Sequence, residues 1–77
     1  MIRAYILIQA EVGAAGDVCT FVRAIDAVTS AEVVSGPYDV IAVAAASSID
    51  ELGRLVVSQV QSVAGITRTL TCPVVQL

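Results

Sequence analysis

Residues 3–12 alternate strictly between two sets of side chains, which is the period of a β-strand. One face carries Ala4, Ile6, Ile8, Ala10 and Val12, and the other carries Arg3, Tyr5, Leu7, Gln9 and Glu11. We therefore predict a strand over residues 3–12 whose second face is also half apolar.

A helical period follows the Gly13-Ala-Ala-Gly16 break. The apolar positions at this spacing are Val18, Phe21, Val22, Ile25 and Val28. Asp17 falls in the first turn, where a carboxylate interacts favourably with free amides and with the helix dipole. The pattern predicts an amphipathic helix that begins near Asp17.

Two further strands are predicted over residues 31–35 and 38–46, with Gly36-Pro37 as the turn between them. The second of these strands is apolar on both faces, which is typical of a central, buried strand. Together the two segments indicate a hairpin.

Ser48 and Glu51 have the spacing of a capping box, so a second helix should begin there. Its apolar stripe is Ile49, Leu52, Val56, Val60 and Val63. Gly65 is expected to end the helix as a left-handed cap.

A last strand is predicted over residues 66–75. Its two faces are Ile66, Arg68, Leu70, Cys72 and Val74 on one side, and Thr67, Thr69, Thr71 and Val75 on the other. Pro73 has no amide hydrogen to donate to a neighbouring strand, which favours a place at the edge of the sheet.

The predicted order is βαββαβ, and right-handed crossovers then give an α+β, ferredoxin-like sandwich. In this fold one antiparallel, four-stranded sheet carries both helices on one face. The other face keeps Tyr5 and Leu7, so we expect a second protomer to cover it and the protein to dimerise through its sheet.

Composition supports association. The chain has 77 residues, enough for a single domain over residues 1–77, and is 57% hydrophobic but only 14% charged. Soluble domains average about 25% charged residues, so little charge is left to cover the surface. The sequence predicts an obligate oligomer, with no disorder, no membrane span and no secretory signal.

The sequence contains few residues that could act in catalysis or bind a metal ion. The chain has no His, which removes the commonest general base and the nucleophilic triads. Cys19 and Cys72 are far apart and lack partner ligands, so no zinc site or other cofactor is predicted. The net charge of −3 argues against direct nucleic-acid binding. We expect a protein that is not an enzyme.

The sequence contains more candidates for residues that bind a small ligand than for catalytic residues. Gly36 lets a ligand approach the backbone, and Asp39 could accept an ammonium group. Alternatively, Gly36 only makes the turn and Asp39 caps it through its own backbone. Thr67, Thr69 and Thr71 are either a ladder of ligand-binding hydroxyls or β-branched residues of an ordinary edge strand.

Three segments taken together resemble the C-terminal effector domain of the Lrp/AsnC regulators, also called the RAM domain, for regulation of amino acid metabolism. They are Tyr5-Ile-Leu-Ile-Gln, Ser35-Gly-Pro-Tyr-Asp-Val-Ile and Gly65-Ile-Thr-Arg-Thr-Leu-Thr, and the resemblance covers residues 3–75. It implies a cytoplasmic domain that senses an amino acid in clefts between dimers, within an octamer-type ring, and acts in transcriptional regulation. Gly36, Tyr38 and Asp39 match the turn that lines this cleft, and Thr67, Thr69 and Thr71 match polar strand positions near it.

The family's regulators also carry an N-terminal helix-turn-helix, which this chain lacks. The resemblance therefore implies either a stand-alone sensing domain or an excised domain, and the initial Met favours the first. Two alternatives remain at this stage. The chain could be an interaction module that modulates a full-length Lrp/AsnC regulator by mixed assembly, or a small dimeric α+β-barrel enzyme, against which the absence of His argues.

Overall fold

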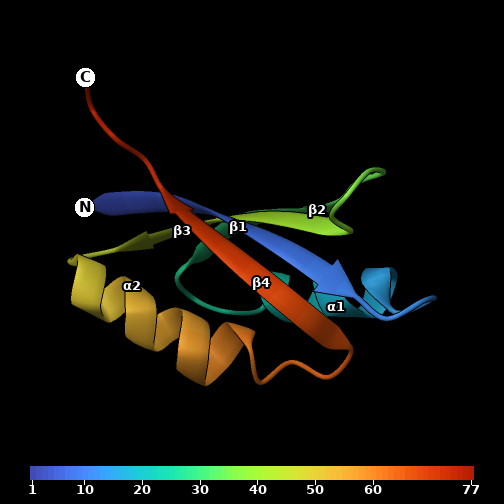
Figure 1. Ribbon diagram of the computed structural model, residues 1–77. Coiled ribbons are helices and arrows are strands. Elements are labelled where there is room, and N and C mark those ends of the chain that lie inside the picture. The colour runs from blue at the N-terminus through green and yellow to red at the C-terminus, as the bar shows by residue number, and fades with distance from the viewer.

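The computed structural model describes residues 1–77. Its elements are β1 (Ile2–Ala10), α1 (Ala15–Arg23), β2 (Val28–Val33), β3 (Val40–Ala46), α2 (Ile49–Leu55), η1 (Val56–Val60) and β4 (Ile66–Pro73). The strands form one antiparallel four-stranded sheet in the order β2-β3-β1-β4, and the helices lie together on one side of it (Figure 1). The predicted ferredoxin-like α+β fold is confirmed.

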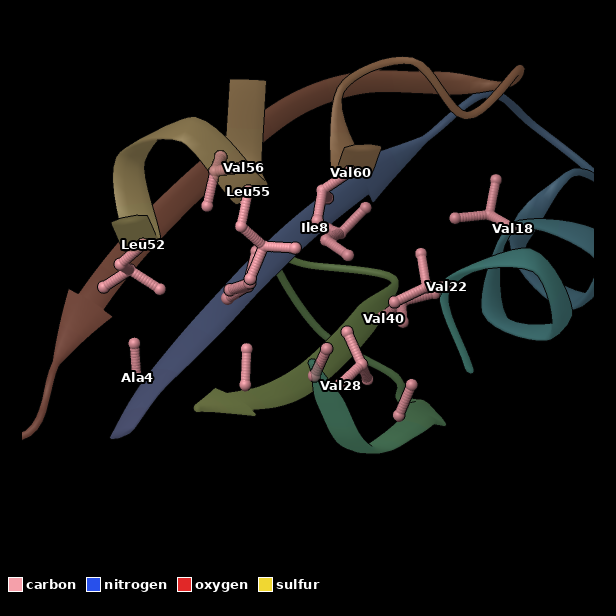
Figure 2. Close-up of a cluster of buried hydrophobic side chains, with 14 of the residues drawn as sticks. Ala4, Ile8, Val18, Val22, Val28, Val40, Leu52, Leu55, Val56 and Val60 are labelled. Atoms are coloured by element: carbon pink, nitrogen blue, oxygen red, sulfur yellow. The ribbon is translucent and has the colours of Figure 1, made fainter. Parts of the chain in front are cut away.

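The core fills the space between the sheet and the helices (Figure 2). It contains 16 buried residues, and none of them is polar. Several core positions in β1 and β3 are alanines, namely Ala4, Ala42, Ala44 and Ala46. Because alanine has a small side chain, the larger residues of α2 and η1, such as Leu52 and Val60, can pack closely against the sheet.

The other side of the sheet is covered by no element of the chain (Figure 1). We call it the open face; its apolar side chains are Tyr5, Leu7, Ile41, Val43, Ala45, Leu70 and Cys72. Leu7 pairs with Ile41 on one side and with Leu70 on the other, so these residues form continuous rows across the strands. Tyr5 and Leu70 are 43% and 41% exposed.

The first strand and the first helix are shorter than the sequence predicted. β1 ends at Ala10, because the chain turns at Glu11, whose amide donates to the Gly65 carbonyl at 2.8 Å. Val12, expected on the buried face, is fully exposed. Val28, expected on the helix, begins β2 instead, because α1 ends at Arg23.

The second helix begins as predicted. The Ser48 hydroxyl accepts a hydrogen bond from the Glu51 amide at 3.1 Å, as an N-cap should. Its last turn, η1, is π-helical and ends at Val60, so Gly65 does not cap the helix. Gly65 instead has φ +93° in the turn before β4, where an added Cβ would lie 3.1 Å from the Cβ of Ala14.

β4 is an edge strand, as predicted, and its register with β1 contains an irregularity. Gln9 pairs with Arg68 and Ala10 with Ile66, so Thr67 is an extra residue, as in a β-bulge. This shift places Ile66 against the core rather than on the face of Arg68, where the simple alternation had placed it.

The two helical segments are short, and neither could span the apolar layer of a membrane.

Candidate functional site

The candidate binding residues lie around the end of β1, because both neighbouring strands begin there. β3 starts beside Ile8, which pairs with Val40, and β4 starts beside Ala10, which pairs with Ile66. The turn that carries Gly36, Tyr38 and Asp39 therefore lies on one side of β1, and Thr67 lies on the other.

Asp39 ties the turn to β1 through both its backbone and its side chain. Its amide donates to the Ile8 carbonyl at 2.9 Å, and its Oδ2 accepts from the Ala10 amide at 2.8 Å. Asp39 is only half-buried, and this bond uses one of its two carboxylate oxygens. The carboxylate does have a structural role, although its partner is β1 rather than its own turn.

Gln9 joins the two sides of the site, although it was not among the predicted binding residues. Its Nε2 donates to the Pro37 carbonyl at 3.1 Å, and its own carbonyl accepts from the Thr67 hydroxyl at 3.2 Å. The available signal was a polar residue near the end of the half-apolar face of the first strand. Because the Thr67 hydroxyl hydrogen is used in this bond, its oxygen can serve a ligand only as an acceptor.

Gly36 and Tyr38 lie in the same turn, and the Tyr38 hydroxyl makes no hydrogen bond to the rest of the chain. Gly36 has φ +150°, a conformation that residues with a side chain rarely adopt, and nothing lies within 4 Å of the position of an added Cβ. A ligand or a neighbouring chain could therefore approach the backbone at Gly36 closely. Tyr38 is half-buried beside Asp39.

Thr69 belongs with Thr67 in a shallow hollow of about 310 Å³ at the edge of β4. The lining residues are Gln61, Ile66, Thr67, Arg68 and Thr69. The Thr69 hydroxyl accepts from Gln61 Nε2 at 3.0 Å, so its hydrogen remains free to donate, for example to a carboxylate.

Thr71 is separated from this group. It pairs with Ile6 in the middle of the sheet and lines a different, mainly apolar groove between β4 and α2. The structure thus brings five of the six candidates to one end of the sheet and leaves Thr71 outside. The β-strand rise and spacing put Asp39 and Thr67 about 10 Å apart across β1, so each supplies a different part of any site.

The end of the sheet can therefore offer an anionic acceptor at Asp39, a neutral acceptor at Thr67, a donor at Thr69 and accessible backbone at Gly36. These are the groups that recognise a small zwitterion. No three His, Cys, Asp or Glu side chains gather in a way that could hold a metal ion.

Several proteins of known structure share this fold. The protein TTHA0845 from Thermus thermophilus superposes with TM-score 0.93 and 26% identity, covering 100% of this chain and 96% of that one. E. coli AsnC superposes with TM-score 0.91 and 23% identity, covering 99% of this chain but 52% of AsnC. The transcriptional regulator NMB0573 of Neisseria meningitidis, solved with L-Met, gives TM-score 0.86 and 19% identity, covering 97% of this chain and 50% of that one.

This chain thus spans about half the length of AsnC and of NMB0573, and nearly the whole of TTHA0845. No curated protein matches it in sequence. The Lrp/AsnC ligand binding domain matches residues 3–76, which is almost every residue of the fold described above. The chain belongs to the Lrp/AsnC ligand-binding domain family.

Proposed function

We propose that this protein is a non-catalytic sensor that binds an amino acid at the end of its sheet and acts in transcriptional regulation. The observation that carries the proposal is that Asp39, on one side of β1, and Thr67 and Thr69, on the other side, lie at the same end of the sheet, together with the exposed Gly36 backbone. The family match to a ligand-binding domain supports it, as does the structure of a relative with L-Met.

An amino acid needs an acceptor for its ammonium group and donors for its carboxylate. The remaining lone pairs of the Asp39 carboxylate would accept from the ammonium group. Backbone amides near Gly36 and the free hydroxyl hydrogen of Thr69 would donate to the carboxylate. The hydrogen bonds already made by Asp39 and Thr67 hold these groups in place before a ligand arrives.

One copy offers only part of such a site, because its groups are spread over a shallow, open surface. We therefore place the complete site where copies meet. The first contact is a dimer in which two open faces cover each other, removing Leu7, Leu70 and their neighbours from water. The complete sites then form where such dimers adjoin in a larger ring.

Ligand binding between copies changes the stability of the assembly through linkage. An amino acid that completes the site would favour the larger assembly, and this change of assembly would be the output of the sensor. Residues 1–77 are proposed to act as one sensing unit in this way.

Isothermal titration calorimetry of the assembled protein against the twenty amino acids tests the proposal. We expect saturable heat with at least one of them, and its loss in Asp39→Asn, which keeps an oxygen for the Ala10 amide but removes the charge. Asp17→Asn makes the same chemical change in the exposed first turn of α1 and should bind like the wild type. Binding by none of the amino acids, or unchanged binding by Asp39→Asn, would overturn the proposal.

A further inference from the structure

The last turn of the second helix is π-helical, and this wide turn decides which of its side chains faces the core. At the end of η1 the Gln61 amide donates to the Val56 carbonyl, five residues back, at 2.9 Å. Val60, five residues after Leu55, is fully buried in the core (Figure 2), whereas Gln59, four residues after Leu55, is exposed. The wide turn thus puts a valine in the core where regular α-helical spacing would put a glutamine.

The position of Val60 also sets the position of the next residue, Gln61, beside β4. Gln61 Nε2 donates to the Thr69 hydroxyl oxygen at 3.0 Å, and both residues line the hollow at the edge of β4. Thr69 is on the helical side of the sheet, since it pairs with the buried Ile8. This hydrogen bond therefore joins the end of the second helix to the candidate site.

The Thr69 hydroxyl differs from three other threonine hydroxyls in the direction of its hydrogen bond. The hydroxyls of Thr20, Thr29 and Thr67 donate to backbone carbonyls at 3.1–3.2 Å, so their hydrogens are already used. Thr69 instead accepts from an N–H, and its own hydrogen cannot point at the hydrogen of that donor. The Thr69 hydrogen therefore points away from Gln61 and is free to donate within the hollow.

We infer that Gln61 is a positioning residue of the amino acid site, and that it makes the site select a free carboxylate over an amide. The inference rests on the proposed function and specifies the class of ligand. A hydroxyl held as a donor binds a carboxylate through a charge-assisted hydrogen bond, which is about twice as strong as a hydrogen bond to a neutral carbonyl. The site then takes free amino acids in preference to amino acid amides or residues within a peptide.

Two substitutions of Gln61 change this hydrogen bond in different ways. Gln61→Glu reverses it, because a carboxylate only accepts, so Thr69 would donate to the new side chain and present its oxygen to the ligand. Gln61→Met keeps a side chain of similar length but donates no hydrogen bond. It also adds no negative charge beside Arg68, which lines the same hollow, and so separates the effect of the bond from that of charge.

Isothermal titration calorimetry with the twenty L-amino acids and their primary amides measures the selectivity. At about pH 6 both kinds of ligand carry an ammonium group, so they differ only at the carboxyl end. The readout is the dissociation constant of an amide divided by that of its free amino acid. For an amino acid that binds, this ratio should be about 10 or more in the wild type.

Gln61→Glu should lower this ratio about tenfold or more, and Gln61→Met about threefold or more. A side chain that only stabilised the end of the helix would weaken the binding of both ligands equally and leave the ratio unchanged. Gln59→Glu and Gln59→Met are the matched controls, because they make the same changes at an exposed position of η1. Both controls should keep the wild-type ratio.

The outcomes separate this inference from the proposed function. A wild-type protein that binds an amino acid but does not prefer it to its amide would overturn the role of Gln61 and leave the proposed sensor standing. The same holds if both Gln61 variants keep the wild-type ratio. A wild-type protein that binds none of the amino acids would overturn the proposed function and this inference together.

Discussion

The carboxylate of Asp39 accepts a hydrogen bond from the amide of Ala10 at 2.8 Å, and so joins the start of β3 to the last residue of β1. This amide lies where the pairing of β1 with β4 becomes irregular, so it needs a partner from outside that ladder. The proposed ligand-binding residue is therefore also a support of the fold, and the two roles can be separated by substitution.

Asp39→Ala removes the acceptor and leaves the half-buried Ala10 amide without its partner. We expect it to lower the free energy of unfolding by about 1–3 kcal/mol. Asp39→Asn keeps an acceptor oxygen and should lower it by less than half as much. Urea denaturation of both variants measures the difference, and equal losses would show that the hydrogen bond does not stabilise the turn.

Gly65 is predicted to be intolerant of any side chain. Its φ is +93°, and an added Cβ would lie 3.1 Å from Ala14 Cβ and 3.2 Å from Val18 Cγ2. Gly65→Ala should therefore cost about 1–3 kcal/mol of stability.

Gly53 provides the matched control, because it lies within α2 and an added Cβ there meets nothing within 4 Å. Gly53→Ala should raise stability by about 0.5–1 kcal/mol, since alanine favours the helix. Thermal denaturation of both variants checks the pair, and a Gly65→Ala protein as stable as wild type would contradict the account.

The contribution of the N-cap of α2 to the stability of the protein should also be measurable by denaturation. Ser48→Ala removes the hydroxyl that accepts from the Glu51 amide and should lower stability by about 1 kcal/mol. Ser47→Ala removes an exposed contact with the Glu51 side chain and should have a smaller effect in chemical denaturation. A larger loss of stability in Ser47→Ala than in Ser48→Ala would contradict the role of Ser48 as the N-cap.

Neighbouring residues of β1 should respond differently to truncation, because they face opposite sides of the sheet. Ile6 is fully buried against the helices, and Ile6→Ala should cost about 2–5 kcal/mol. Leu7 lies on the open face, so Leu7→Ala should chiefly weaken association. Sedimentation of Leu7→Ala over a dilution series checks this, and a wild-type dissociation constant would remove Leu7 from the interface.

The fold could be predicted from the sequence because its determinants are local. The alternation through Ala4, Ile6 and Ile8 and the capping residue Ser48 each act over a few positions, and both appear in the structure as expected. The ends of elements were less predictable. Val28 fitted a helical stripe, but the strand that it begins pairs with Ala44, a contact that no local pattern records.

The candidate site was only partly predictable for the same reason. Asp39 and Thr67 were recognisable as candidates, but their positions on the two sides of β1 depend on hydrogen bonds to Ala10 and Gln9, which lie far away in the sequence. Simple alternation placed Thr67, Thr69 and Thr71 on one face of the last strand. Thr69 and Thr71 do share a face, opposite Ile8 and Ile6, but Thr67 is the extra residue of an irregularity that arises from strand pairing. Thr71 lies farther along this face, beside α2.

The native mass of the wild-type particle, recorded with and without the amino acid that calorimetry identifies, is the most direct check on a sensor assembled from several copies. We expect dimers and their multiples throughout, with the larger species gaining population when the amino acid is added. A 77-residue monomer that persists at high concentration and does not respond to any amino acid would contradict this account.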